Sequence, residues 1–229
     1  MAQRTTALAP HRPKDPASLR ERNKTDKLRR IKDAARELFV SNGFDETTTR
    51  EIAIRAGVGI GTVFTYADNK RDLLFLVAND ELAEVTAAAE ASLRQDASCL
   101  QNLTGFFRHH YKFYAQQPEL SRLLLREMTF YDSGRQAARF QQTREKNIKI
   151  VGDVMQMAAD RKAIRIAEDP QFVGWVAFCI FQVELRRWLM SRNPVLSSGM
   201  KSLERALRLL MTGLDATPGA FNVRRSQGG

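Results

Sequence analysis

A glycine-rich turn between two short helical segments constrains this chain most. Residues 47–70 are TTTREIAIRAGVGIGTVFTYADNK, and Ile52 and Ala56 are spaced as one face of a helix. Gly57 can take the positive φ that ends a helix, and a second helix is expected over residues 62–66. This layout is typical of a helix-turn-helix, in which the second helix enters the major groove of DNA.

This stretch also has two other interpretations. A plain corner between two helices of a helical domain remains an alternative. A phosphate-binding loop is not supported, because Thr62 stands where G-x-G-x-x-G needs its last glycine. The segment before the glycines also has helical rather than strand periodicity.

The charge balance favours a polyanionic partner. The formal net charge is +10 and the pI is about 10.0. Such a chain suits nucleic acid or an anionic membrane surface, although a solvated basic surface is the alternative. Much of the excess lies near the N-terminus, where residues 1–24 contain three prolines and little apolar content, typical of a disordered arm. The basic residues up to position 30 are Arg4, Arg12, Lys14, Arg20, Arg22, Lys24, Lys27, Arg29 and Arg30.

The sequence lacks the signals of several other classes. Cys99 and Cys179 are too few for a metal cluster, and no metal site or cofactor is expected. No catalytic motif with its structural context is present, so we do not expect an enzyme. No apolar run approaches the ~18 residues of a membrane span, and no signal peptide is apparent, which predicts a cytoplasmic protein.

The segment before the turn completes a three-helix unit. Leu28, Ile31, Ala35 and Leu38 form an apolar stripe over residues 25–42. Residues 28–74 then resemble the N-terminal domain of the TetR (tetracycline-repressor-like) family of transcriptional regulators. The resemblance rests on the mutual spacing of Ala34, Ala35, Leu38, Phe39, Gly43, Thr48, Thr49, Ile52, Ala53, Ala56, Gly57, Val58, Gly61, Thr62, Val63, Phe64, Lys70, Leu73 and Leu74.

The resemblance implies a set of DNA-contacting residues. The Thr49 hydroxyl and the amides at its helix start would hold a phosphate. Thr62 and Thr65 would reach base edges or a thymine methyl. Lys70 matches a phosphate-contacting lysine of the family. The full expected set is Arg30, Thr48, Thr49, Gly61, Thr62, Phe64, Thr65, Tyr66 and Lys70.

Three positions depart from the family pattern. Phe64 stands where the family usually has tyrosine, so a phosphate hydrogen bond from that hydroxyl should be missing. Ala67 replaces a common buried phenylalanine, and Gly59 replaces a serine that could cap the second helix. These departures put single contacts in doubt rather than the motif.

The rest of the chain is expected to be helical. Helices are predicted over residues 70–93, 100–117, 119–128, 136–161, 170–192 and 198–214. The predicted fold class is all-α, with an N-terminal three-helix helix-turn-helix domain and a C-terminal helical ligand-binding and dimerisation domain. The expected parts are a disordered basic arm (1–24), the DNA-binding domain (25–70), the effector-binding and dimerisation domain (71–216) and a flexible tail (217–229).

The last two predicted helices are the most apolar. The first of them is apolar on nearly all sides, so it should be buried either inside the chain or against a second copy. The resemblance favours a homodimer through these two helices, and a two-fold dimer would place two recognition helices on a palindromic operator.

An aromatic segment indicates either an ordinary helical core or a small-molecule pocket. Aromatic walls with a few polar groups suit an effector that is itself apolar or aromatic. The resemblance favours a pocket. Its expected effector-binding residues are Phe107, His110, Tyr111, Tyr114, Trp175, Phe178 and Gln182.

The combined expectation is a sequence-specific DNA-binding regulator, a homodimeric repressor that a small effector releases from its operator. The alternative is a helical adaptor that binds acidic lipid or protein through its basic arm.

Overall fold

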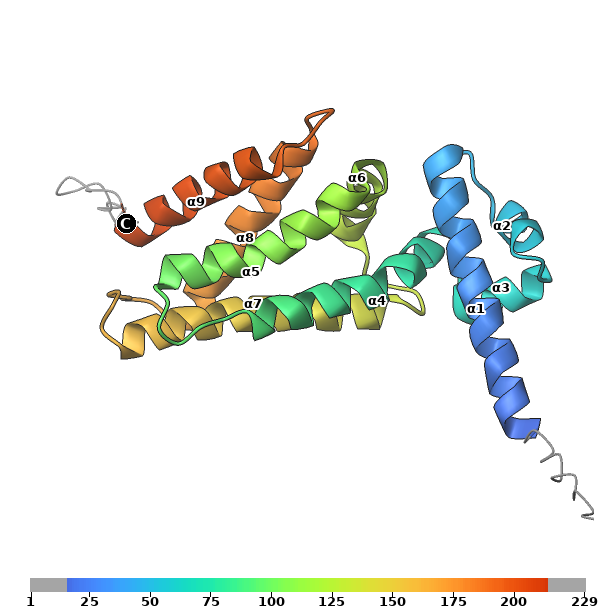
Figure 1. Ribbon diagram of the computed structural model, residues 1–229, viewed down its shortest axis with the longest axis horizontal. Coiled ribbons are helices and arrows are strands. Elements are labelled where there is room, and N and C mark those ends of the chain that lie inside the picture. The colour runs from blue at the N-terminus through green and yellow to red at the C-terminus, as the bar shows by residue number, and fades with distance from the viewer. Residues whose placement is uncertain (1–15, 214–229) are drawn as a thin grey trace, which may run out of the picture. The chain divides into compact units, whose positions relative to one another are not determined.

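The computed structural model describes residues 16–213, and every regular element in that range is helical (Figure 1). The predicted all-α class is therefore confirmed. The chain divides into two compact units between Val77 and Ala78, inside helix α4 (Lys70–Ala91). The predicted domain boundary, between residues 70 and 71, lies at the start of the same helix. In the described range, no helix is long and apolar enough to cross a membrane.

The first unit is built on three helices and the start of α4. They are α1 (Pro16–Ser41), α2 (Thr49–Arg55) and α3 (Ile60–Tyr66). The apolar stripe predicted for α1 faces α2, and the two short helices pack on each other. Ile31, Ile52, Val63 and Leu74 are fully buried apolar side chains that α1, α2, α3 and the start of α4 contribute to the core of this unit. This core sets the angle between α2 and α3, as the helix-turn-helix pattern requires.

The predicted disordered arm is wrong for residues 16–24, because α1 begins at Pro16. Proline is tolerated in the first turn of a helix, where its missing N–H has no intrahelical partner. The following Leu, Arg, Glu and Lys residues are good helix formers, and Glu21 and Lys24 form an ion pair (3.8 Å). The remaining part of the predicted arm, residues 1–15, and the predicted tail, residues 217–229, lie outside the described residues.

The second unit contains the rest of α4 and five further α-helices. They are α5 (Cys99–Gln116), α6 (Pro118–Glu127), α7 (Ala137–Asp160), α8 (Pro170–Leu189) and α9 (Leu196–Thr212), with a short 3₁₀ turn η1 (Met128–Phe130) after α6. All five predicted helices of this region are present, with ends within a few residues of those expected. Helix α7 packs along α8, and α9 covers α5 and α8.

Helices α7 and α8 cross at two glycines. A Cβ atom added at Gly174 would lie 2.4 Å from the Cα of Gly152 and 2.5 Å from its nitrogen. The two backbones therefore touch directly, without a side chain between them. Ala177, one turn further along α8, is fully buried.

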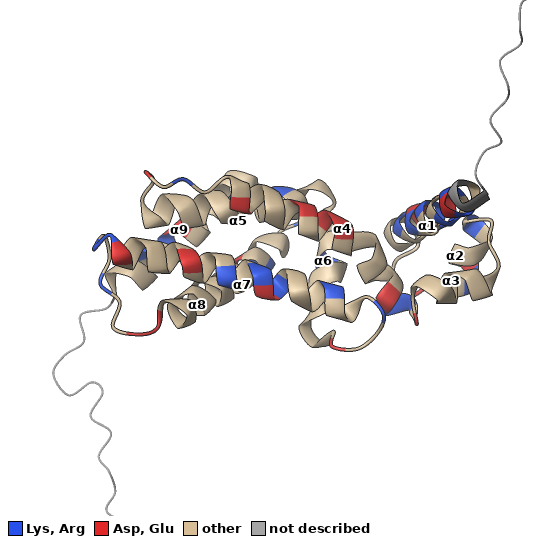
Figure 2. Cartoon of the chain, turned by 90° about the horizontal axis from the view of Figure 1, so that it is seen from below, with Lys and Arg blue, Asp and Glu red and all other residues tan. Residues whose placement is uncertain are grey.

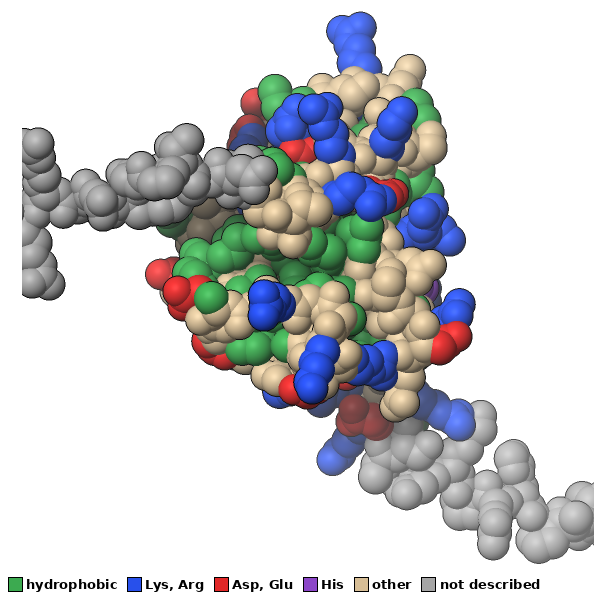
Figure 3. Space-filling model, turned by 90° about the vertical axis from the view of Figure 1, so that its left-hand side faces the viewer, with side chains coloured by type: hydrophobic (Ala, Val, Ile, Leu, Met, Phe, Trp, Pro, Cys, Tyr) green, Lys and Arg blue, Asp and Glu red, His purple; other side chains and the backbone are tan. Residues whose placement is uncertain are grey.

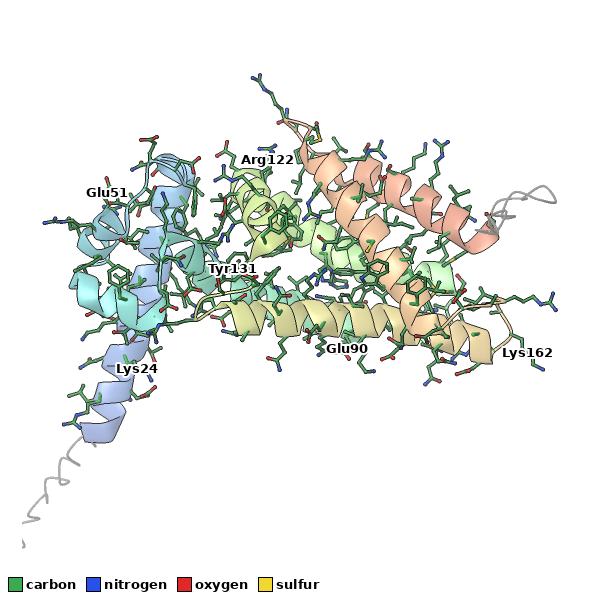
Figure 4. The ribbon with its side chains drawn as sticks, turned by 180° about the vertical axis from the view of Figure 1, so that it is seen from behind. Lys24, Glu51, Glu90, Arg122, Tyr131 and Lys162 are labelled. Carbon is green, nitrogen blue, oxygen red and sulfur yellow. The ribbon has the colours of Figure 1, made fainter. Side chains whose placement is uncertain are left out.

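Polar contacts close the second unit at its edges. Arg122 of α6 donates to the carbonyl oxygens of Leu189 (2.7 Å) and Ser191 (2.9 Å), which lie at the end of α8 (Figure 4). These carbonyls would otherwise lack partners, as at any helix C-terminus. On the other side, Glu90 of α4 pairs with Lys146 of α7 (2.7 Å).

We expect Gly174→Ala to lower the free energy of unfolding by about 1–3 kcal/mol, because the new methyl group forces two packed backbones apart. Thermal melting followed by circular dichroism measures this. Gly105→Ala in α5 is the matched control, since a Cβ there meets nothing within 4 Å. The control should be neutral or slightly stabilising, and an equal loss in both variants would contradict the close crossing.

Candidate nucleic-acid interface and ligand cavity

Helix α2 begins at a capping box. The Thr48 hydroxyl accepts a hydrogen bond from the Glu51 N–H (3.2 Å), and the Glu51 carboxylate accepts one from the Thr48 N–H (2.7 Å; Figure 4). This backbone hydrogen bond from Thr48 is the main cause that lowers the pKa of Glu51, and the positive charge of Lys70 contributes less. Thr48 therefore acts first as the cap, and Thr49 is the first residue of the helix proper.

Helix α3 presents one buried and one open face. Val63 and Ala67 are buried, whereas Gly61 and Thr65 are exposed and Phe64 is 42% exposed. Thr62 is half-buried, and a Cβ added at Gly61 would meet nothing within 4 Å. The open face is thus formed by small residues and one aromatic ring. As the sequence predicted for Gly59, the first turn of α3 has no side-chain cap.

Tyr66 and Lys70 are held by backbone carbonyl groups of the same unit. The Tyr66 hydroxyl donates to the Lys24 carbonyl oxygen (3.3 Å; Figure 4). The Lys70 ammonium donates to the carbonyl oxygen of Asp45 (2.9 Å) and lies 4.7 Å from the centre of the Phe44 ring. The bond to Asp45 uses one of the three donors of the ammonium, and phosphate contact by Lys70 stays a prediction.

Arg30 has a structural role that the sequence did not indicate. Its guanidinium donates to the Ala56 carbonyl (2.8 Å) and its Nε to the Asp26 carboxylate (3.0 Å). It therefore joins α1 to the end of α2, next to Gly57, whose φ is +62°. Basic and acidic side chains lie close together along α1 (Figure 2). Asp26 pairs with Arg29 and Arg30, and Asp33 pairs with Arg29. Contact between Arg30 and DNA stays a prediction.

A cavity of about 370 Å³ lies within the second unit. Its wall includes His110 and Tyr114 of α5 and Phe178 and Gln182 of α8, four of the residues predicted for effector binding. The volume is in the range of small-molecule pockets. Much of the remaining wall comes from α7, which the sequence analysis did not consider. Those residues are Phe140, Gln141, Thr143, Arg144 and Asn147.

Three predicted effector residues do not line this cavity. Phe107 is fully buried and stacks on Phe181, with ring centres 4.4 Å apart. Tyr111 is also fully buried and contacts Trp188 (4.9 Å between ring centres). Trp175 is 43% exposed and stacks on Phe172 instead. Helical spacing predicts that the aromatic residues share one face of α5. It does not predict which of them α8 and α9 cover and which of them line the cavity.

His110 belongs to a buried polar network. Its Nδ1 lies 3.2 Å from the Phe106 carbonyl oxygen, and its Nε2 lies 3.1 Å from Asn147 Oδ1. Asn147 in turn donates to the hydroxyl of Thr86 on α4 (3.0 Å). Burial lowers the pKa of His110 to about 4, so the ring is neutral at pH 7. The network connects two residues of the cavity wall to α4.

Arg144 and Arg186 are cavity residues that sequence reasoning missed. A signal was present for Arg186, because Phe178, Gln182 and Arg186 are spaced by four and therefore share one face of a helix. Among the described residues, no group of three or more His, Cys, Asp or Glu side chains could hold a metal ion.

The DNA-binding segment matches a known family. Residues 31–77 match the family described as "Bacterial regulatory proteins, tetR family". The fatty acid metabolism regulator protein of Bacillus subtilis (strain 168) is 27% identical over 100 residues, which span 44% of this chain and 52% of that protein. The transcriptional repressor KstR of Mycobacterium tuberculosis is 24% identical over 191 residues, 83% of each chain.

Solved structures share the fold. FadR of Thermus thermophilus, a TetR-family repressor crystallised with lauroyl-CoA, has a TM-score of 0.62 at 24% identity, covering 88% of this chain and 98% of that one. FadR of Bacillus subtilis, crystallised with stearoyl-CoA, has a TM-score of 0.63 at 20% identity, covering 81% and 98%. At these identities the likeness concerns the fold of both units.

We expect Arg30→Ala to destabilise the first unit by about 1–2 kcal/mol, because carbonyl groups at the end of α2 lose a charged donor. Thermal melting without DNA measures this. Arg29→Ala is the matched control, since Arg29 is exposed and, within residues 16–213, pairs only with Asp26 and Asp33 on its own helix. An unchanged melting temperature for Arg30→Ala would show that its contacts in α2 are not stabilising.

Proposed function

Because the chain belongs to the TetR family of bacterial regulatory proteins through residues 31–77, we propose that it is a homodimeric transcriptional repressor that a small effector releases from its operator. The observation that carries this proposal is the open face of α3. Gly61, Phe64 and Thr65 are exposed on a helix whose opposite face is fixed by buried Val63. A short helix held in this way can enter the major groove. We place this activity in the cytoplasm.

Each DNA-contacting residue has a proposed task. Thr62 and Thr65 contact base edges, and Gly61 lets the α3 backbone come close to the DNA. Thr49, Tyr66 and Lys70 contact phosphates. The Phe64 ring, which has no hydroxyl, offers apolar contact instead of a phosphate hydrogen bond. Phosphate contacts dominate the affinity and base contacts the sequence preference.

Exposed apolar residues on α8 and α9 support a homodimer. Phe172, Trp175 and Val183 of α8 and Leu209 of α9 are each about half-exposed in the single chain. Helix α8 is therefore not buried on all sides by its own chain. Of the two options that the sequence left open, this favours burial against a second copy. Figure 3 shows hydrophobic side chains gathered between basic ones on one end of the second unit. A second copy that covers this apolar surface would give the two-fold symmetry of a palindromic operator.

The cavity in the second unit is the proposed effector site. Its wall combines aromatic and apolar side chains with polar ones, which small-molecule sites use to orient a ligand. The FadR structures were solved with acyl-CoA molecules, so fatty acyl thioesters are the first compounds to test here. The adaptor alternative is not favoured, because the similar proteins are transcriptional regulators.

The polar network offers a route from the cavity to α4. A ligand that contacts His110 or Asn147 changes the hydrogen bonds that these residues share with Thr86. Helix α4 continues from Thr86 back to Lys70, one of the proposed phosphate contacts. Release from DNA requires the effector to bind better to the α4 conformation that is not competent for operator binding.

Selection from random double-stranded DNA at two salt concentrations tests the DNA-binding proposal. We expect enrichment of a palindrome with half-sites about one helical turn, or about 34 Å, apart. On the enriched site, Thr62→Ala and Thr65→Ala should change the preferred bases. Lys70→Ala should weaken all DNA sequences similarly and reduce the salt slope by about 1 per subunit.

Lys149→Ala is the control for the loss of one positive charge, since Lys149 pairs with Asp153 on the surface of α7. It should leave the affinity for the selected site unchanged. If Lys70→Ala and the two threonine variants altered selected and random DNA identically, the division between phosphate and base contacts would be wrong.

Addition of an acyl-CoA should release the selected DNA in a mobility-shift or fluorescence-anisotropy assay. Coenzyme A without an acyl chain should release less, because it cannot fill the apolar part of the cavity. Retention of the complex at all concentrations of lauroyl-CoA and stearoyl-CoA would exclude these two compounds as effectors.

A further inference from the structure

The cavity carries positive charge without a matching negative charge. Arg144 of α7 and Arg186 of α8 both line it. Among the described residues, the wall contains no aspartate and no glutamate. His110 is neutral at pH 7, because burial lowers its pKa to about 4. The two guanidinium groups are thus the only charged groups that the described residues contribute to the wall.

Neither arginine forms an ion pair within residues 16–213. Arg186 donates through Nη1 to the carbonyl oxygen and the side-chain oxygen of Gln182, each at 2.9 Å. Both acceptors are neutral. Arg144 has no hydrogen-bond acceptor and no acidic partner in that range, although its charge acts on its neighbours. A guanidinium has five N–H donors, so most donors of this pair are available to a ligand.

The two charges are close enough to affect each other. Burial is the main cause that lowers the pKa of Arg186, Tyr114 opposes this effect, and the nearby Arg144 charge lowers the pKa further. Arginine nevertheless stays protonated in proteins. Arg186 is half-buried whereas Arg144 is exposed, so burial disfavours the charge of Arg186 and the two like charges repel each other. A bound anion would offset the repulsion and the desolvation of Arg186.

One part of the wall suits the apolar part of such a ligand. Phe178 and Phe181 of α8, Phe140 of α7 and Leu82 of α4 line the same cavity. Helices α7 and α8 thus contribute both the two arginines and three of these four apolar side chains. A ligand that contacts both these apolar residues and the two arginines therefore has an apolar body and an anionic group.

We propose that Arg144 and Arg186 together bind the anionic group of an amphipathic effector whose apolar part lies against Phe140, Phe178 and Phe181. This inference rests on the proposed function of the cavity as the effector site. It revises the expectation of a purely apolar or aromatic effector. The anionic group is a carboxylate or a phosphate, since planar guanidinium groups bind both in bidentate geometry.

Calorimetric titration of the full chain without DNA tests this inference with three ligands that share a twelve-carbon chain. They are lauroyl-CoA, lauric acid and 1-dodecanol, of which only the alcohol is uncharged. We expect at least one anionic ligand to bind more tightly than 1-dodecanol. Arg144→Ala and Arg186→Ala should each weaken that ligand by about 10- to 100-fold and leave 1-dodecanol nearly unchanged.

The two anionic ligands distinguish the source of the anion. A loss confined to lauroyl-CoA would assign the arginines to the phosphates of coenzyme A. A loss with lauric acid would assign them to a carboxylate. Arg139→Ala is the matched control, because Arg139 lies on α7 outside the cavity wall and pairs with Asp80, and it should bind all three ligands as the wild type does.

Three results would overturn the inference. They are failure of both anionic ligands to bind more tightly than 1-dodecanol, unchanged affinity in both arginine variants, and an equal loss in Arg139→Ala. Arg144→Gln and Arg186→Gln decide the matter if the alanine variants do not melt cooperatively. Operator binding by the same preparations is measured separately, so a regulator that binds its operator but ignores the anion would contradict this inference alone.

Discussion

The direct contact between the backbones of α7 and α8 is the constraint on which the second unit depends. Gly152 and Gly174 let the two helix backbones touch. Arg144 precedes Gly152 by eight residues, and Gln182 follows Gly174 by eight. Both residues line the cavity, together with aromatic side chains from α5 and α8. The helices that meet at the two glycines thus also contribute much of the cavity wall.

The polar groups near the cavity fall into two kinds with different consequences. His110, Asn147 and Thr86 are buried and bonded to one another, so they contribute to a specific arrangement of α4, α5 and α7. Arg144 and Arg186 have no acidic partners in the described range, and their donors remain available. A structural network and a ligand-binding pair thus lie in one wall. This arrangement lets a ligand that binds the arginines act on the hydrogen bonds of α4.

The first unit depends on a different constraint. Its core of a few apolar residues must hold α3, a helix of seven residues, at a defined angle. Local hydrogen bonds contribute much of the required rigidity. The capping box of Thr48 and Glu51 fixes the start of α2, and Arg30 fixes its end. With both ends held, the buried Val63 orients α3 and leaves Gly61 and Thr65 exposed. Binding then carries no large entropic cost of ordering α3.

The sequence by itself determined the helical class, the order of the helices and the helix-turn-helix, because periodicity, glycine positions and caps are local properties. It failed at residues 16–24, where prolines suggested disorder although proline is compatible with a first helical turn. Only the tertiary structure decided that Phe107 and Tyr111 are buried in the core and that Trp175 lies outside the cavity wall. It also placed Arg144 and Arg186 in the same cavity wall. The reason is physical: helical spacing specifies a face, whereas the partner that covers each part of that face depends on how helices distant in sequence pack.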